Sequence, residues 1–122
     1  VIGFCFGGLC ALDIARSNAD AAGVVSFHGL LHAPDNTADK IEPKVLALHG
    51  WDDPMAKPDD VNAFASEMTA AGADWQLVAY GGTAHAFTNP AADAPDMGLK
   101  FHSLNRDRSF AACKTFLDEV FD

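Results

Sequence analysis

Basic residues are scarce in this chain, and it has neither a long apolar run nor a closely spaced pair of cysteines. Eight lysines and arginines stand against 17 aspartates and glutamates, which gives a formal net charge of −9. Because no basic patch offsets this charge, we expect no nucleic acid and no membrane surface among its partners. No stretch reaches the roughly 18 apolar residues of a membrane span, and no charged segment followed by an apolar one marks a secretion signal. These features favour a soluble, cytoplasmic protein.

The spacing of the three cysteines argues against the usual roles of paired cysteines. Cys5, Cys10 and Cys113 form no Cys-x-x-Cys pair, and an odd number without paired spacing favours a reducing compartment over a disulfide framework or a zinc site. Cys10 falls in a predicted helix and Cys113 in an apolar stripe near the C-terminus, so we expect both to be buried in the core. We expect no metal and no cofactor.

Strand and helix patterns alternate along the sequence, and the chain has the length of a single domain. The 122 residues, 49% of them hydrophobic, suffice for one core and not for two. Apolar, β-branched segments alternate with segments of helical period, which predicts an α/β fold with a mostly parallel sheet and functional loops at the strand carboxyl ends. The predicted strands are 1–4, 22–27, 44–49 and 74–80, the predicted helices are 8–16, 58–71 and 105–121, and 28–43 and 88–104 are expected to be irregular, the first with room for one helical turn.

The segment Gly3–Gly8, with the sequence GFCFGG, lies where the first strand turns into the first helix. In a nucleophile elbow the reactive residue occupies a strained strand-to-helix turn, and glycines two positions before and after it let strand and helix approach closely. Gly3 and Gly7 hold these positions around Cys5. The helix N-terminus would favour a thiolate, and the N–H of Phe6 would face a developing oxyanion. A tight turn around an inert thiol is the other interpretation of this segment.

Two later loops supply the groups that a nucleophilic cysteine needs. One is His49–Pro54 (HGWDDP), after the third strand, and the other contains His85, after the fourth. A cysteine nucleophile needs an imidazole to take its proton and a carboxylate to orient the imidazole. The chain order nucleophile, acid, base is that of the α/β-hydrolase fold. We therefore predict that Cys5 is the nucleophile and His85 the base, with Asp52 and Asp53 as rival acids.

Together with GFCFGG, the stretches Leu48–Pro54 (LHGWDDP) and His85–Pro90 (HAFTNP) resemble the C-terminal half of a dienelactone hydrolase family protein. The resemblance covers almost the whole chain and implies an α/β-hydrolase fold, in which residues 1–122 are a single partial domain. In the family the catalytic triad occupies the positions of Cys5, Asp53 and His85. The family's acid stands three residues after the glycine and before a proline or similar residue, which favours Asp53 over its neighbour.

The resemblance implies a hydrolase that cleaves small esters or enol-lactones, such as dienelactone, through an acyl-thioester intermediate. It also implies that a further N-terminal half of the family fold, with a second oxyanion donor and groups that bind a substrate carboxylate, lies outside these residues. If the molecule ends at Val1, the strand before Cys5 exposes edge groups, and the isolated chain should be poorly stable or inactive. The alternatives are a non-catalytic fragment that needs a partner or that N-terminal half to fold, and a broad-specificity carboxylesterase or thioesterase.

Further residues next to these motifs have both a functional and a structural interpretation. Phe6, Trp51 and Phe87 each adjoin a predicted catalytic residue, and each could line a substrate pocket or pack in the core. His28, at the carboxyl end of the second strand, could border the active site or be an ordinary strand-end histidine. A metal site made of His28 and His32 is disfavoured because a glycine lies between them and no third ligand has a suitable spacing.

Overall fold

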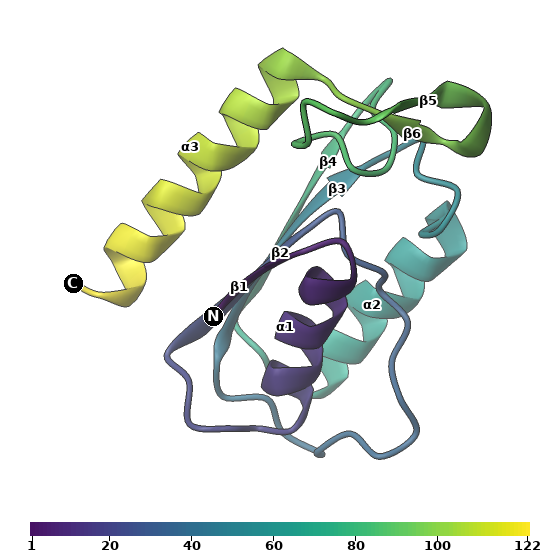
Figure 1. Cartoon of the computed structure of the whole chain (residues 1–122). Coiled ribbons are helices and arrows are strands. Elements are labelled where there is room, and N and C mark those ends of the chain that lie inside the picture. Colours follow the sequence, from purple (N-terminus) through teal and green to yellow (C-terminus); the bar gives the residue numbers. More distant parts are fainter.

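Four parallel strands form the central sheet of the computed structural model, which describes all 122 residues (Figure 1). The predicted α/β architecture is confirmed, and the largest shifts of a boundary are at the first and third helices, which begin two residues earlier than predicted, at Phe6 and Ser103. The sheet has the order β1-β2-β3-β4, so each strand pairs with its successor in the chain. In chain order the elements are β1 (Ile2–Phe4), α1 (Phe6–Arg16), β2 (Gly23–Phe27), β3 (Lys44–Gly50), α2 (Pro58–Ala70), β4 (Trp75–Tyr80), β5 (Asp93–Ala94), a 3-10 helix (Pro95–Met97), β6 (Leu99–Lys100) and α3 (Ser103–Val120).

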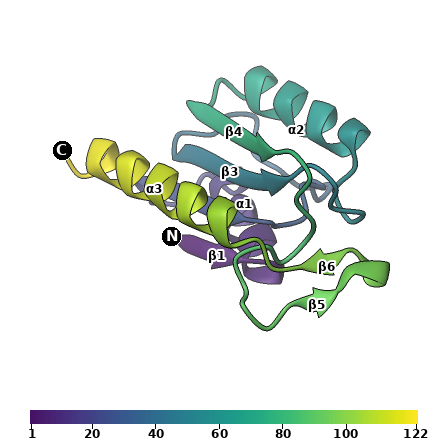
Figure 2. The ribbon, with the colours of Figure 1, turned by 90° about the horizontal axis from the view of Figure 1, so that it is seen from above.

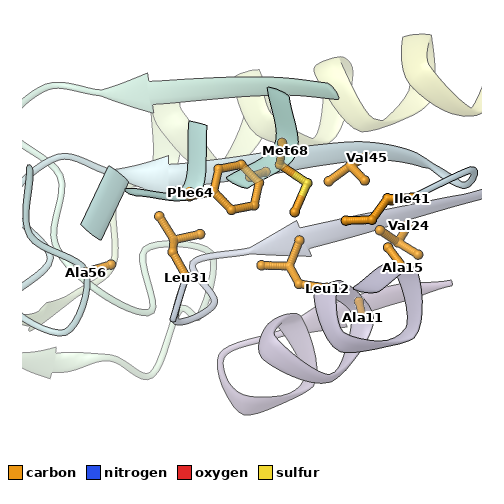
Figure 3. Close-up of a cluster of buried hydrophobic side chains, with 11 residues drawn as sticks. Ala11, Leu12, Ala15, Val24, Leu31, Ile41, Val45, Ala56, Phe64 and Met68 are labelled. Carbon is orange, nitrogen blue, oxygen red and sulfur yellow. The ribbon is translucent and has the colours of Figure 1, made fainter. Parts of the chain in front are cut away.

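Helices cover both faces of the sheet: α1 and α2 lie on one face and α3 on the other (Figure 2). Successive strand residues point to opposite faces, so Val45 and Ala47 pack toward α1 and α2, whereas Leu46 and Leu48 pack toward α3. Burial on both faces explains why the inner strands are almost continuously apolar. None of the helices has both the length and the apolarity needed to cross a membrane. Figure 3 shows the cluster between the sheet and the first two helices, to which α1 contributes Ala11, Leu12 and Ala15 and α2 contributes Phe64 and Met68.

Residues 28–43 connect β2 to β3 without any helical turn. A buried arginine fastens this connection, since the Arg16 guanidinium is 1% exposed and donates to the carbonyl oxygens of Leu31, at 2.7 Å, and His32, at 3.2 Å. The same guanidinium pairs with Glu67 of α2 at 2.8 Å. One side chain therefore ties α1, α2 and the irregular segment together, and it satisfies backbone carbonyls that no secondary structure satisfies.

The segment 88–104 is more regular than expected, because β5 and β6 form a small antiparallel hairpin within it. The hairpin holds the loop that follows β4: the His85 N–H donates to the Gly98 carbonyl at 2.9 Å, and the Lys100 N–H donates to the His85 carbonyl at 3.2 Å. Strands of two residues are too short to leave an alternating pattern in the sequence. The backbone of His85 is thereby fixed on both sides.

The cysteines are not all buried. Cys113 lies in the core between the sheet and α3, as predicted, but Cys10 is exposed. The prediction for Cys10 was wrong because α1 turns its Ala11 and Leu12 side toward the sheet, which leaves Cys10 on the outer side of the helix. Cys10 is thus an accessible thiol in the same molecule as Cys5.

Gly3 and Gly7 differ in what they contribute to the turn. A Cβ atom on Gly3 would lie 1.8 Å from the carbonyl oxygen of Gly7, whereas a Cβ on Gly7 itself would meet nothing within 4 Å. The second close approach involves Gly8, where a Cβ would lie 2.9 Å from the Cα of Gly29. Gly3 and Gly8 therefore allow the strand and helix to pack closely, and the expectation that Gly7 is needed for this packing was wrong.

The contrast predicts opposite effects of two alanine substitutions. Gly3→Ala places a methyl group against backbone atoms that cannot move independently, and it should lower the free energy of unfolding by about 3 kcal/mol. Gly7→Ala lies in a helix with open space around it and should raise that free energy by up to about 1 kcal/mol. Urea unfolding followed by circular dichroism measures both, and equal stability of the two variants would contradict the packing described here.

Candidate active site

Four ionisable side chains meet at the carboxyl edge of the sheet, one after each strand. Cys5 follows β1, His28 follows β2, Asp53 follows β3 and His85 follows β4. The carboxyl ends of parallel strands share one edge, so residues far apart in the sequence come together. The sulfur of Cys5 and one ring nitrogen from each histidine lie within 4.8 Å of one another.

Cys5 occupies a strained turn between β1 and α1. Its φ is 54° and its ψ is −119°, a backbone conformation that residues with a side chain rarely adopt. The Cys5 N–H donates to the Phe27 carbonyl at 3.0 Å, which ties the turn to β2. Phe6 is the first residue of α1, so its N–H has no acceptor within the helix. The turn thus presents a half-buried thiol beside a helix N-terminus.

Asp53 and His85 form a buried pair. Asp53 Oδ2 and His85 Nδ1 are 2.7 Å apart, and the two residues are 2% and 5% exposed. The other carboxylate oxygen of Asp53 accepts from the Met55 N–H at 2.8 Å. The carboxylate favours the tautomer with the proton on Nδ1, which leaves the lone pair of Nε2 free to accept a proton. Its neighbour Asp52 is exposed, so the structure pairs His85 with Asp53 alone.

His28 is the side chain that contacts the Cys5 sulfur directly. Its Nδ1 lies 3.2 Å from Sγ, and its Nε2 lies 2.8 Å from the hydroxyl oxygen of Thr88. No hydrogen bond joins Cys5 to His85. Burial, reinforced by nearby His85, lowers the pKa of His28 to about 4, so the ring is neutral at pH 7. The second histidine therefore holds the sulfur as a neutral hydrogen-bond partner.

The Cys5 thiol stays protonated in this arrangement. Burial raises the pKa of Cys5 above its ordinary value, and the negative charge of Asp53 raises it further. The partial positive charge of the helix N-terminus acts in the opposite direction, since it favours a thiolate. A base must therefore remove the proton when the sulfur reacts, and both neighbouring histidines offer a ring nitrogen within 4.8 Å. Of the two, only His85 is paired with a carboxylate that would stabilise its protonated form.

The three aromatic candidates lie in different surroundings. Phe6 is 73% exposed and Trp51 is 42% exposed, so neither packs in the core. The Trp51 ring meets the buried His49 ring edge-on at 6.2 Å. Phe87 is completely buried, and its ring meets that of His28 edge-on, with the ring centres 5.2 Å apart.

Thr88 is a residue of this site that the sequence analysis did not single out. It is buried and bonds the far nitrogen of His28. The stretch HAFTNP includes it, but a lone threonine in a loop carries no signal of its own. His32, by contrast, is exposed and lies apart from the cluster.

Comparison with known proteins gives consistent matches along the chain. A profile of the dienelactone hydrolase family matches residues 1–121. An uncharacterized protein of Caenorhabditis elegans is 34% identical over 98% of this chain and 78% of its own length. The solved structure of m3DLH is 43% identical, with a TM-score of 0.90 over 99% of this chain and 51% of that one. A dienelactone hydrolase-like promiscuous phosphotriesterase from metagenomic libraries is 35% identical, with a TM-score of 0.90 over 98% of this chain and 51% of that one.

The two solved structures are much longer than this chain, which spans about half of each. Other solved α/β hydrolases share its fold at lower identity. The matched part includes the whole parallel sheet and the edge at which the cysteine, the two histidines and the aspartate meet.

Proposed function

Because this chain belongs to the dienelactone hydrolase family, we propose that it hydrolyses small carboxylic esters and enol-lactones with Cys5 as the nucleophile. The family makes the chain part of a hydrolase, and the choice of nucleophile and substrate is our proposal. The observation that carries it is the buried Asp53–His85 pair, at 2.7 Å, beside a cysteine on a strained strand-to-helix turn. This order of nucleophile, acid and base supports acyl transfer.

In the first step the Cys5 sulfur attacks the substrate carbonyl carbon. His85 Nε2 accepts the thiol proton, and Asp53 stabilises the imidazolium that forms. The sulfur and the His85 ring nitrogen are within 4.8 Å, and such contacts tighten when substrate binds. The N–H of Phe6 donates to the oxyanion. The bond to the leaving oxygen then breaks, His85 returns its proton to that oxygen, and an acyl-thioester remains on Cys5.

In the second step water completes the hydrolysis. His85 accepts a proton from a water molecule, whose oxygen attacks the thioester carbonyl. The carbon–sulfur bond breaks, the carboxylic acid leaves, and the sulfur recovers its proton from His85. Enol-lactones suit this chemistry because an enolate leaving group needs little protonation, whereas an amide would demand more of the acid.

A rapid-quench experiment tests this proposal. With an activated ester or an enol-lactone, mass spectrometry of the quenched protein should find one acyl group on the peptide that contains Cys5 and none on those that contain Cys10 or Cys113. Product analysis with a thioester and a phosphate triester, the latter suggested by the similar metagenomic enzyme, defines the substrate range. Turnover accompanied by acylation of Cys10 alone, the exposed thiol, would contradict the assignment of Cys5.

One observation favours a second candidate, a chain that needs a further segment or a partner to be active. β1 pairs only with β2 and leaves Ile2 and Phe4 46% and 45% exposed. Both residues line an apolar hollow of about 260 Å³ beside α3, and unpaired edges with apolar side chains are usually covered. The comparison is between this chain and a version extended at its N-terminus with the corresponding half of m3DLH. Equal ester turnover by the two would exclude the second candidate.

A further inference from the structure

We propose that Cys5, His28 and His85 also form a binding site for a single Zn²⁺ ion. Their three ligand atoms lie within 4.8 Å of one another. In a tetrahedral site with Zn–S near 2.3 Å and Zn–N near 2.0 Å, neighbouring ligand atoms are about 3.3 to 3.6 Å apart. The Cys5 sulfur and His28 Nδ1 are already 3.2 Å apart. Small side-chain movements therefore bring the three groups to ligand distances.

Both histidines are held from behind as zinc-binding histidines are. His28 Nε2 is 2.8 Å from Thr88 Oγ1, and His85 Nδ1 is 2.7 Å from Asp53 Oδ2. Such contacts orient the ring and direct the opposite nitrogen to the metal. The nitrogens left free are Nδ1 of His28 and Nε2 of His85, on the side of the Cys5 sulfur. This arrangement is a second observation, independent of the closeness of the three ligands.

The charges at the site also suit a divalent cation. On binding, the Cys5 thiol releases its proton to solvent and the thiolate bonds the metal, while each neutral imidazole donates one lone pair. The two positive charges of Zn²⁺ are then balanced by the thiolate and by the Asp53 carboxylate behind His85. Cys5 is half-buried while both histidines are buried, so the metal reaches the cluster from the Cys5 side.

This site differs from the expectation of no metal, which rested on the lack of paired cysteines and of a third ligand for His28 and His32. His32 is exposed and does not join the cluster. The ligand partners come instead from the loops after β1 and β4, which no sequence spacing reveals. A sulfur bonded to zinc is a weaker nucleophile than a free thiolate, and zinc would also occupy the nitrogen of His85 that accepts the thiol proton, so zinc would inhibit hydrolysis. That consequence rests on the proposed function, but zinc binding does not.

Alkylation of the two accessible thiols tests the site within one molecule. The full chain is treated with iodoacetamide with and without Zn²⁺, and the rates at Cys5 and Cys10 are followed by peptide mass spectrometry. Saturating Zn²⁺ should slow the alkylation of Cys5 at least about tenfold, because the metal withdraws electron density from the sulfur and the two histidine ligands crowd it. The exposed Cys10 should react at an unchanged rate, and a chelator should restore the rate at Cys5. Failure to protect Cys5, or equal protection of both thiols, would overturn the site.

Substitutions distinguish the residues that would bind zinc from those that only support them or lie apart from the site. His28→Gln should raise the Zn²⁺ concentration needed for protection by about 100-fold, and Thr88→Val, which removes only the supporting hydroxyl, by about tenfold. His32→Gln is the matched control and should leave protection unchanged. Undiminished protection in His28→Gln would overturn the proposal. If circular dichroism shows that this variant is unfolded, Thr88→Val decides, and an unchanged zinc dependence there counts against the site.

The zinc site and the proposed function can fail separately. Protection of Cys5 in a chain that hydrolyses no ester would support the site and refute the function. Hydrolysis that depends on Cys5, without protection by Zn²⁺, would do the reverse. Cobalt offers a further check, because Co²⁺ bound to a thiolate and two imidazoles should show a sulfur-to-cobalt charge-transfer band that disappears in Cys5→Ala.

Discussion

Cys5→Ala is expected to lower kcat/KM for a reactive ester by about 10⁴-fold or more. The substitution removes the atom that forms the acyl intermediate, and the oxyanion donor and binding contacts alone supply only a small part of the rate. The measurement is steady-state hydrolysis of an activated ester by purified protein, with the fold of the variant checked by circular dichroism. The turn itself should persist, because its hydrogen bonds come from the Cys5 backbone.

Cys10→Ala is the matched control for this prediction. Cys10 is exposed on α1 and takes part in none of the contacts at the site, so its removal should leave kcat/KM within about a factor of two of the original, since surface changes of this kind are nearly neutral. A folded Cys5→Ala variant that retained the normal rate would refute a cysteine nucleophile. Loss of activity in Cys10→Ala alone would point to Cys10 as the nucleophile. Because Cys10 lies on the outer side of α1, that result would contradict the proposed mechanism.

Asp53→Asn should lower kcat by about 10³- to 10⁴-fold. Asparagine has nearly the same shape, but its amide can donate to Nδ1 of His85 and so favour the tautomer with the proton on Nε2. That tautomer cannot accept the thiol proton, and it lacks the negative charge that stabilises the imidazolium. KM should change much less than kcat, because Asp53 contacts the histidine and the loop backbone rather than the substrate.

Asp52→Asn provides the control at the adjacent position. It changes the net charge by the same amount, but Asp52 is exposed and its side chain does not contact His85, so kcat should stay within about a factor of two. A larger loss in Asp52→Asn than in Asp53→Asn would contradict the pairing seen in the structure.

The layered sheet could be predicted from the sequence because its strands are buried on both faces. Val45–Leu48 and Val24–Phe27 are apolar at every or nearly every position, a pattern that the helical segments around them do not share. The edge of the sheet followed from the same argument, since polar residues directly after such strands must meet. The residues alone left Asp52 and Asp53 as rival acids, and the resemblance to the family favoured Asp53. In the structure His85 pairs with Asp53.

Other features could not be predicted from local sequence patterns. The contact between Cys5 and His28, and the support that Thr88 gives to His28, join segments from three different loops. In the sequence, Arg16 is a cation at the end of a predicted helix. Only the structure shows that it is buried and that it donates to carbonyl oxygens. Whether Cys10 is buried depends on which side of α1 faces the sheet. The apolar residues of this helix lie on two neighbouring sides, so the sequence did not decide between them.

The small β5–β6 hairpin has a consequence for how related enzymes can diversify. Its hydrogen bonds hold the backbone of His85 through Gly98 and Lys100, so the position of His85 depends on the paired strands β5 and β6 more than on the short helix Pro95–Met97 that joins them. Exchanges among these exposed connecting residues would alter the surface of the loop while leaving His85 in place. Selection can then act on substrate preference and on chemical competence as separate traits.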